Sequence, residues 1–366
     1  MGEKPETPIR FGIIGCAKIA GKVARAINLA PSSVLYAIGS RSIEKAKQFA
    51  SANGVHESVK IYGSYDQVLD DPFVDAVYMP LPTSLHLHWA VMAARRKKHV
   101  LIEKPTALDV TELEQILEAC ESNGVQFMDG SMWLHHPRTV KMKEMLFDSN
   151  HLGDVNYIYS TTTTSVSPEF LENDIRVKAD MDALGALGDI GWYCLGAILW
   201  AKNYQLPTLV TALPDVSKNS NGVILSCSAS IQYGEPAETV AIIQCSFFSS
   251  TSMDLAITGS RGSLNLRDFI IPYQESSASF EFTLGAKFLQ LHIGWNVKPQ
   301  KVVVASELPQ EALMVQEFAR LVHGIRTSAS HPDPKWPDIS RKTQMLLDAV
   351  KKSVDFGCKP VYFLGL

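Results

Sequence analysis

A lysine at the end of an apolar run is the first residue of this chain that could do chemistry. The run Val100–Ile102 is followed at once by Glu103-Lys104-Pro105. Because proline cannot donate to a β-ladder, we expect the strand to end here and to deliver Lys104 to its carboxyl end. Ligands of open α/β sheets bind along that edge, where a lysine can polarise a hydroxyl or hold a tyrosinate. The alternative is an ordinary surface lysine in a strand-to-helix loop.

A carboxylate and a phenol form the second candidate group. Asp189 and Tyr193 are four residues apart, so a helix would place them on one face, among small glycines. Together they could form the polar floor of a substrate pocket. Tyrosine alone is a poor base because its pKa is about 10, but a neighbouring ammonium such as that of Lys104 would lower this pKa. The alternative is that Tyr193 is a core aromatic residue and Asp189 a helix cap.

A nucleotide-binding turn is predicted near the start of the chain. A strand-like run precedes the turn and a helical pattern follows it, as in a dinucleotide-binding βαβ unit. The three template positions for glycine hold Gly15, Ala17 and Ala20, so the motif relies on its context. The residues that we predict to bind the cofactor in this turn are Gly15, Cys16, Ala17, Lys18 and Ile19.

Two polar residues at the end of the second predicted strand bear on the choice of cofactor. Proteins that bind NAD usually carry Asp or Glu there, but this chain has Ser40 and Arg41. The guanidinium can pair with a 2′-phosphate and the hydroxyl can donate to it, which favours NADP and leaves NAD possible. A capping serine followed by a solvated arginine is the alternative.

A proline-rich loop follows the strand predicted at Ala76–Met79. Its position at the carboxyl edge predicts that it flanks the nicotinamide end of a cofactor, although Ser84 could make it an ordinary helix cap. The residues assigned to cofactor binding here are Leu81, Pro82, Thr83 and His86, and those in the lysine segment are Glu103 and Lys104.

The elements that must position these residues differ between the first third of the chain and the middle. Short apolar strands alternate with amphipathic helices in the first third, which predicts a doubly wound parallel sheet. The predicted strands are Ile9–Ile14, Val34–Gly39, Ala76–Met79, Val100–Ile102 and Gln126–Met128, and the predicted helices are Lys18–Leu29, Ile43–Ala52, Leu85–Arg96 and Val110–Ser122.

The middle of the chain predicts an open, mostly antiparallel sheet, because strand-like segments follow one another through short turns such as Gly259-Ser260-Arg261-Gly262. The predicted strands are Val155–Thr164, Leu209–Leu213, Val223–Tyr233, Thr239–Phe248, Met253–Thr258 and Ser263–Leu266, with helices at Gly185–Trp200, Glu311–His323 and Ile339–Phe356. One sheet face alternates apolar residues with too few helices to cover both faces, which predicts a homo-oligomer, most simply a dimer.

The whole-chain composition excludes several classes of protein. The 366 residues suit two domains, with 46% hydrophobic and 20% charged residues, and a net charge of −4 does not suggest nucleic acid or an anionic membrane as partner. The apolar runs are too short to span a bilayer, and the first residues do not form a signal peptide. The six dispersed cysteines are predicted to be reduced, the compartment cytoplasmic, and no metal site is expected.

With these segments in view, the chain resembles the glucose–fructose oxidoreductase and inositol dehydrogenase family (Gfo/Idh/MocA) over nearly its whole length. The resemblance rests on the Gly15 turn, Pro82-Thr83-x-x-His86, Glu103-Lys104-Pro105, Met132-Trp133 with His136-Pro137, and Gly185-Ala186-Leu187-Gly188-Asp189-x-Gly191-x-Tyr193. It implies a Rossmann domain followed by an α/β domain with an open sheet that often mediates oligomerisation. It also implies that Lys104 lies near the nicotinamide and the reacting hydroxyl, with Asp189 and Tyr193 lining the substrate site.

Details of the resemblance narrow the expectation. Inositol-dehydrogenase-like members carry His where this chain has Tyr193, so the pattern is closer to the dimeric dihydrodiol dehydrogenase and NADP-xylose dehydrogenase branch. Leu134 stands where many members have Arg, and Leu184-Gly185-Ala186 replaces a usual triple glycine, which leaves the substrate's identity open. Ala17 also replaces the more common second glycine. Substrate contacts are assigned to Trp133, His136 and Arg176.

The resulting prediction is an NADP-dependent oxidoreductase that acts on the carbinol or carbonyl of a sugar-like or cyclic polyol substrate. Tyr193 is the expected proton donor or acceptor with Lys104 lowering its pKa, the reverse assignment stays open, and Asp189 orients a hydroxyl or Lys104. Two alternatives are a non-catalytic NADP-binding regulator and an NAD-dependent lyase or glycosidase of the same family. The predicted domains are 1–134 for NADP, 135–310 for substrate and oligomerisation, and 311–366 as C-terminal helices that complete the fold.

Overall fold

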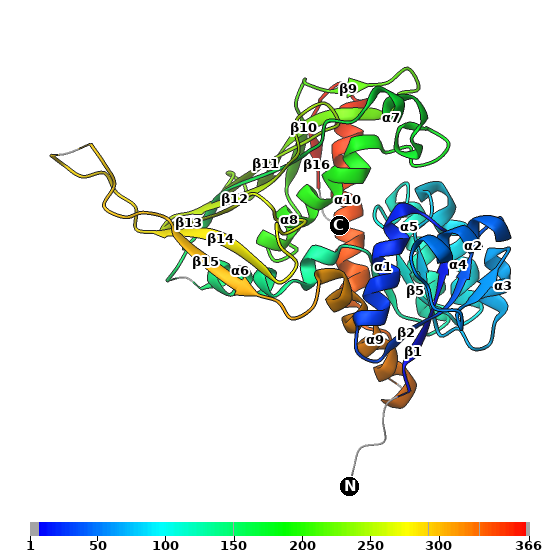
Figure 1. Ribbon diagram of the computed structural model, residues 1–366. Helices are drawn as coiled ribbons and strands as arrows, with labels where there is room; N and C mark the ends of the chain where they lie inside the picture. The colour runs from blue at the N-terminus through cyan, green and yellow to red at the C-terminus, as the bar shows by residue number, and fades with distance from the viewer. Residues whose placement is uncertain (1–6, 149, 292, 329, 364–366) are drawn as a thin grey trace, which may run out of the picture. The chain divides into compact units, whose positions relative to one another are not determined.

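The structure is a computed structural model that describes residues 7–148, 150–291, 293–328 and 330–363 (Figure 1). The chain divides into two compact units. The N-terminal unit comprises residues 1–135 and 308–341, and the C-terminal unit comprises residues 136–307 and 342–366. The chain therefore returns to the N-terminal unit after the second sheet. Helix α9 (Gln310–Ser328) lies wholly in that unit, and α10 (Lys335–Asp355) begins there and ends in the C-terminal unit.

The N-terminal unit is a six-stranded parallel sheet in the order β3-β2-β1-β4-β5-β6, which is the doubly wound order of dinucleotide-binding domains. Its strands are β1 (Ile9–Ile14), β2 (Ser33–Gly39), β3 (Lys60–Tyr62), β4 (Ala76–Met79), β5 (His99–Ile102) and β6 (Phe127–Asp129). Its other helices are α1 (Lys18–Leu29), α2 (Ile43–Ala52), α3 (Tyr65–Asp70), α4 (His86–Arg95) and α5 (Val110–Ser122), with 3₁₀ turns η1 (Thr83–Leu85) and η2 (Met132–His135).

The predicted elements of this unit are confirmed, with the short β3 and α3 missing from the prediction. The strands are buried on both faces, as expected for a parallel sheet covered by helices. Side chains that accept a hydrogen bond from the backbone define three helix starts: Ser42 caps α2 through Lys45 N, Ser64 caps α3 through Gln67 N, and Asp109 caps α5 through Glu112 N. Helix α9 packs against α1, and Phe318 contacts Phe11 with ring centroids 6.0 Å apart.

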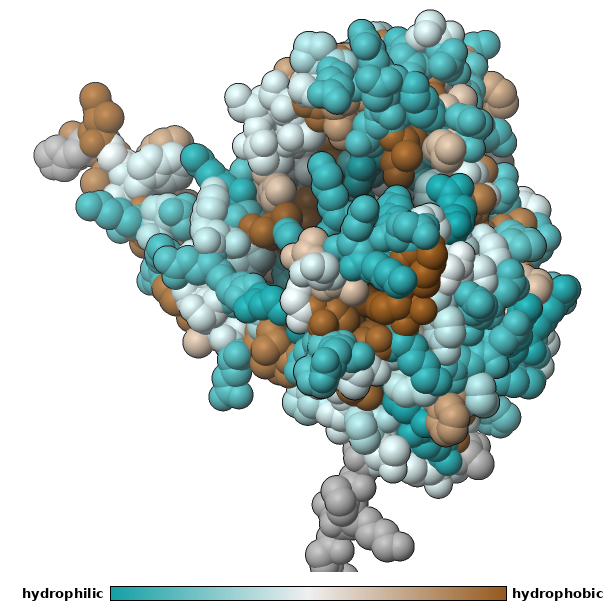
Figure 2. Space-filling model, turned by 45° about the vertical axis from the view of Figure 1, so that its right-hand side comes forward, coloured by the Kyte–Doolittle hydropathy of each residue, from teal (hydrophilic) through white to brown (hydrophobic). Residues whose placement is uncertain are grey.

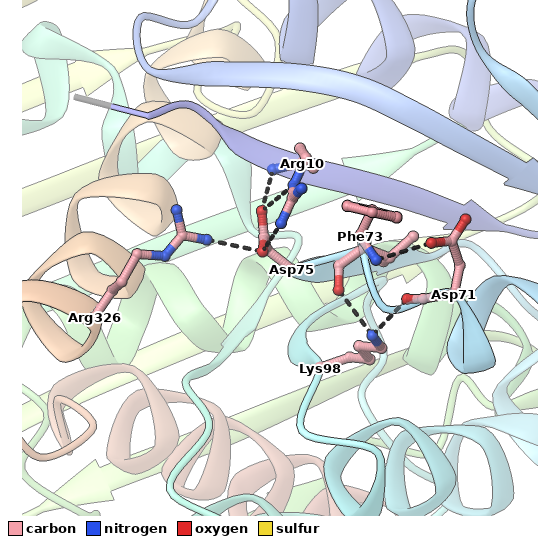
Figure 3. Close-up of polar contacts among 7 residues, drawn as sticks. Arg10, Asp71, Phe73, Asp75, Lys98 and Arg326 are labelled. Carbon is pink, nitrogen blue, oxygen red and sulfur yellow. Dashed lines mark hydrogen bonds and ion pairs between the residues drawn. The ribbon is translucent and has the colours of Figure 1, made fainter. Parts of the chain in front are cut away.

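A polar cluster ties α9 to the amino-terminal ends of the strands (Figure 3). Asp75 accepts hydrogen bonds from Arg10 Nε and Nη2, both 2.9 Å long, and pairs with Arg326 of α9 at 2.8 Å. The buried Lys98 donates from Nζ to the carbonyl oxygens of Asp71 and Val74, both at 2.8 Å. This cluster occupies the edge of the sheet opposite to Gly15 and Lys104, so it stabilises the unit away from the candidate site.

The C-terminal unit is built on a ten-stranded sheet in the order β15-β14-β13-β12-β7-β11-β10-β8-β16, with β9 paired to β10. All neighbours are antiparallel except β7 and β11. The strands are β7 (Val155–Thr163), β8 (Leu209–Ala212), β9 (Ser217–Lys218), β10 (Ile224–Tyr233), β11 (Thr239–Ser246), β12 (Ser252–Gly259), β13 (Gly262–Leu266), β14 (Ser277–Leu284), β15 (Gln300–Ala305) and β16 (Val361–Tyr362). The open, mostly antiparallel sheet is therefore confirmed.

The two faces of this sheet differ in burial. The inner face is closed, with Ile158, Ile243 and Leu255 at 0% exposure. The opposite face, called the outer face below, presents partly exposed side chains at alternate positions of β7, β11 and β12. The helical segments of the unit are α6 (Pro137–Phe147), α7 (Pro168–Asn173), η3 (Ile175–Val177), η4 (Leu187–Gly191) and α8 (Trp192–Ala201), followed by the end of α10.

Candidate active site

The turn after β1 requires a glycine and lies beside the loop after β4. Gly15 has a φ of +123°, and a Cβ at this position would come 2.9 Å from Leu81 Cδ2 and 3.1 Å from Pro80 O. Strands β1 and β4 are neighbours that lead to helices on opposite sides of the sheet, so their carboxyl ends form the switch point where dinucleotides bind. The predicted cofactor turn and nicotinamide loop therefore meet in the fold.

The amino terminus of α1 fits a pyrophosphate. Ala17 is the N-cap residue and has no side-chain capping bond, so no side chain of the cap competes for the first amides of the helix. These amides and the helix dipole favour an anion. Cys16 and Ile19 are partly exposed and Lys18 is exposed, whereas Ala20 is buried and lets the helix approach the sheet. The predicted cradle thus has the geometry that a dinucleotide needs.

At the end of β2, the residue that caps the next helix differs from the two residues predicted to bind the 2′-phosphate, Ser40 and Arg41. Ser42, two residues later, caps α2, so the alternative that Ser40 is the cap is wrong. Burial raises the pKa of the Cys16 thiol, and a hydrogen bond with the hydroxyl of the buried Ser40 lowers it only in part. Arg41 is exposed and lies close to Tyr65, whose pKa is raised by burial and partly lowered by the guanidinium. Ser40 therefore lies next to the Gly15 turn, and Arg41 is exposed to solvent.

Lys104 is the second residue after β5, at the carboxyl end of the strand as predicted, and it is partly exposed. The preceding Glu103 accepts a 2.5 Å hydrogen bond from the Tyr78 hydroxyl. Burial raises the pKa of Glu103, which Tyr78 and the Lys104 charge lower only in part. Gly130 makes room for this carboxyl, since a Cβ there would lie 2.9 Å from Glu103 Oε1. The lysine thus stands on a buried, hydrogen-bonded carboxyl group.

A second buried acid in this cluster escaped the sequence prediction. Asp129 ends β6, accepts a 2.8 Å hydrogen bond from Ser131 N, and is also bonded by the Ser340 hydroxyl of α10. Burial raises its pKa, and its charge raises that of Glu103 in turn. The signal was present, because Asp129 stands at the carboxyl end of a predicted strand, as Lys104 does.

His86, predicted to contact the cofactor, connects two loops of the site. It is fully buried, with Nε2 3.0 Å from the Leu81 carbonyl oxygen and Nδ1 3.1 Å from that of Thr106. The imidazole therefore fixes the loop after β4 to the loop after Lys104. Thr83 is also buried, and Ser84 lies inside η1 without capping α4, so helix capping does not explain this loop.

In the C-terminal unit, Asp189 is paired with the predicted substrate residue Arg176. Arg176 Nε lies 3.0 Å from Asp189 Oδ2, and its Nη1 lies 3.1 Å from Asp174 Oδ1. The charge of Asp189, followed by that of Asp174, raises the pKa of Arg176 despite burial. Asp189 is therefore not a helix cap. Asp174 was missing from the sequence prediction.

Tyr193 lies in the first turn of α8, directly after the π-helical turn η4 that carries Asp189. Its side chain is mostly buried, at 7% exposure. Gly191 between them lets the turn approach the sheet, since a Cβ there would lie 3.2 Å from Cys245 Sγ. π-Helical turns are rare and occur often at functional sites. The segment thus holds a carboxylate and a phenol on a firmly packed turn.

The other two predicted substrate residues are almost completely buried. Trp133 of η2 is 1% exposed. His136, also 1% exposed, caps α6 by accepting a 2.9 Å bond from Arg138 N, and burial lowers its pKa to about 4. Arg138 in turn forms a buried 2.5 Å ion pair with Asp268. These contacts account for His136 as a structural residue, and a substrate contact for it stays a prediction.

Two family profiles match this chain in sequence. An oxidoreductase family with an NAD-binding Rossmann fold matches residues 9–131, and the Gfo/Idh/MocA C-terminal domain matches residues 139–265. The chain belongs to the Gfo/Idh/MocA oxidoreductase family. The predicted resemblance is thereby confirmed, and the Gfo/Idh/MocA protein is an oxidoreductase whose first unit is a nicotinamide-dinucleotide-binding Rossmann fold.

Individual relatives agree with this assignment. An uncharacterized oxidoreductase of Rhizobium meliloti is 30% identical over 351 residues, which cover 95% of this chain and 98% of the relative. A dTDP-3,4-didehydro-2,6-dideoxy-α-D-glucose 3-reductase of Actinomadura kijaniata is 38% identical over 191 residues, about half of each chain (52% and 55%). A solved 3-ketoreductase from Actinomadura kijaniata, a mutant in complex with NADP and TDP-benzene, matches with a TM-score of 0.77 at 26% identity, covering 94% of this chain and 97% of that one.

Among the described residues, no helix is long and apolar enough to cross a membrane. The six cysteines are free of disulfide bonds, although Cys227 and Cys245 face each other across β10 and β11 with their Sγ atoms 3.5 Å apart. Their reduced state stays a prediction.

Proposed function

We propose that this oxidoreductase is NADP-dependent and acts on the carbinol or carbonyl group of a sugar-like or cyclic polyol substrate. The observation that carries the proposal is the position of Lys104 at the carboxyl end of β5, in the sheet whose β1–β4 switch point holds Gly15. When bound, NADP supplies or accepts a hydride at its nicotinamide ring. The side chains of the protein bind and orient the cofactor and the substrate, and they exchange a proton with the substrate.

The choice of NADP is supported by the end of β2. Ser40 and the exposed Arg41 take the place of the acidic residue that binds the ribose hydroxyls of NAD. A guanidinium can bind a 2′-phosphate through two charge-assisted hydrogen bonds. The reductase structure from Actinomadura kijaniata, which has the same fold, contains NADP.

We assign the proton transfer to Tyr193, with Lys104 as the ammonium that lowers its pKa. The substrate hydroxyl would give its proton to the Tyr193 oxygen during oxidation and regain it during reduction. The reverse assignment, with Lys104 as the proton-transfer group, remains the second candidate. Asp189 would orient a substrate hydroxyl, and Arg176, fixed between two carboxylates, would hold Asp189 and present its remaining donors to the substrate.

A screen for turnover tests this function. Absorbance of the reduced nicotinamide would be followed with NADP or NADPH and a panel of aldoses, polyols, trans-dihydrodiols and their keto forms. We expect turnover with at least one member of the panel, and a loss of about 10²–10⁴-fold in kcat in Lys104→Ala. Tight NADP binding without turnover of any member of the panel would refute the proposed enzymatic function and favour a non-catalytic NADP-binding regulator. Neither the regulator nor the lyase has support from the relatives.

We further propose a cytoplasmic homodimer that forms through the outer face of the C-terminal sheet. The seven longer adjacent strands from β15 to β10, at about 4.8 Å spacing and with about three alternate residues each, present roughly 700 Å², close to the ~800 Å² that one partner usually contributes to a stable interface. Apolar side chains lie at its centre, including Tyr159 and Ile242, which face each other across β7 and β11. Light scattering that gives a monomer at micromolar concentration would refute the dimer. The free cysteines support a reducing compartment.

A further inference from the structure

A β-hairpin arm projects from the end of the C-terminal sheet between β14 and β15 (Figure 1). We define the arm as residues 284–291 and 293–299. It carries six exposed large apolar side chains, namely Leu284, Phe288, Leu289, Leu291, Ile293 and Trp295. Leu291 is 89% exposed and Phe288 75%, and Figure 2 shows hydrophobic side chains gathered on the projecting tip at the upper left. Soluble monomers rarely expose so many apolar groups together, so the arm is built for contact.

The arm has a defined structure that can present these side chains. Phe288 and Trp295 form an antiparallel bridge, and their ring centroids lie 4.6 Å apart. Asn296 closes the base, accepting a 2.6 Å hydrogen bond from Lys287 N and donating to Gly285 O at 3.1 Å. Rigid aromatic groups on a fixed hairpin lose little conformational freedom on binding.

The charge on the arm narrows the choice of partner. Residues 282–306 contain no Asp or Glu, whereas Lys287, Lys298 and Lys301 are exposed. The strand register places the arm at the same end of the sheet as the turn between β10 and β11, because Leu284 pairs with Gly262 and Thr239 with Tyr233. That turn carries the exposed Glu235 and Glu238. A basic, apolar arm and an acidic turn therefore lie at one end of one sheet, on opposite sides of its centre.

We propose that the arm docks on the acidic β10–β11 turn of a second copy of this chain. The proposal rests on the outer-face dimer proposed above. Two outer faces can stack with a two-fold axis parallel to the strands or across them. Only the parallel axis keeps the same strand ends together while reversing the strand order, so that β14 and β15 of one copy lie over β8 and β16 of the other, next to β10. The arm of each copy then reaches the acidic turn of its partner, and two arms close the interface symmetrically.

Dimer dissociation constants measured in a dilution series by sedimentation velocity test the proposal. We expect Phe288→Ser/Trp295→Ser to raise the dissociation constant at least about 100-fold, because such aromatic anchors dominate interface affinity. The matched control Val140→Ser, which removes another half-exposed apolar side chain of the same unit, should change it less than about twofold. An equal effect of both variants, or none of the arm variant, would overturn the proposal.

Charge exchange tests the assigned partner surface. Lys287→Glu/Lys298→Glu and Glu235→Lys/Glu238→Lys should each weaken the dimer about tenfold, and the combination should restore it to within about threefold. Weakening without restoration would exclude the arm-to-turn contact. Ile242→Arg, at the centre of the outer face, separates the two proposals. If it dissociates the dimer while the arm variants do not, the outer-face dimer stands and the arm contact is wrong, and a monomeric unmodified protein refutes both.

Discussion

Replacement of Gly185 by alanine gives the sharpest test of how the fold positions Asp189. Gly185 precedes η4, has a φ of +58°, and a Cβ there would lie 1.9 Å from the backbone oxygen of Ile224 and 2.8 Å from Val223 Cγ1. An L-residue in this conformation costs about 1–2 kcal/mol. Because the main obstacle is the backbone of β10 rather than a flexible side chain, displacement adds about 1–3 kcal/mol. We expect Gly185→Ala to lower the free energy of unfolding by roughly 2–5 kcal/mol.

Gly222→Ala is the matched control in the same unit. Gly222 has a φ of +80°, and a Cβ there would meet no heavy atom within 4 Å. This variant therefore carries the conformational cost alone, about 1–2 kcal/mol. For both variants we would measure the free energy of unfolding by urea denaturation, and KM and kcat with a substrate found in the screen. The comparison separates the cost of the positive φ from the cost of the steric clash with β10.

The Gly185 variant should also lose activity, because the carbonyl that it displaces borders the turn carrying Asp189. Gly222→Ala should keep the KM and kcat of the unmodified protein. Equal destabilisation by the two variants would mean that the backbone of β10 at Ile224 moves aside at no measurable cost. Normal kcat and KM in a destabilised Gly185→Ala would refute the argument that this close approach sets the position of Asp189.

Four further predictions address the cofactor, the chemistry and the stability of the N-terminal unit. Arg41→Ala should raise the NADP dissociation constant about 10–100-fold and leave NAD binding nearly unchanged in titration calorimetry, since a charge-assisted pair is worth roughly 1.5–3 kcal/mol; tighter binding of NAD by the unmodified protein would contradict it. Tyr193→Phe should lower kcat about 10²–10⁴-fold and keep NADP binding. Combining it with Lys104→Ala should lower kcat little further. A fully active Tyr193→Phe protein would refute the mechanism. Burial raises the pKa of Asp75, but hydrogen bonds and charges from two arginines outweigh it and lower the pKa. Asp75→Asn should therefore lose about 1–3 kcal/mol of unfolding free energy at pH 7, and this deficit should shrink as the pH falls below about 4 in urea denaturation, whereas a constant deficit would exclude the linkage. His86→Ala should lower the melting temperature and raise the KM for NADP, and an unchanged KM would show that the two loops hold their positions without the imidazole.

The strands and helices of both units could be predicted where the apolar pattern was long and regular. Strand β1 and helix α1 match the prediction residue for residue. Strand β3 escaped because Lys60–Tyr62 is three residues long and only partly buried, too short for any periodicity. Strands β14 and β15 escaped for another reason. Their side chains alternate, but small polar residues in β14 and three consecutive valines in β15, of which Val303 is exposed, weaken the contrast on which the pattern depends.

The candidate site divides in the same way. Lys104 could be placed because proline ends the strand, which is a local rule. The roles of Arg176 and His86 could not be derived, because their partners Asp189 and Thr106 are 13 and 20 residues away and meet them only in the folded chain. The strand ends could mark Glu103 and Asp129 as candidates, but their hydrogen-bond partners Tyr78 and Ser340 are distant in the sequence and meet them only in the folded chain.

The two buried acids bear directly on how Lys104 can act. Burial raises the pKa values of Glu103 and Asp129, and the charge of Asp129 raises the pKa of Glu103 further, which opposes two full negative charges beside the lysine. The short hydrogen bond from Tyr78 and the space left by Gly130 keep the Glu103 carboxyl in place between the ends of β4 and β6. The cluster therefore positions the backbone of Lys104, whose amide also donates a 3.3 Å hydrogen bond to Glu103 Oε2, at the carboxyl end of β5 where the proposed function needs a lysine.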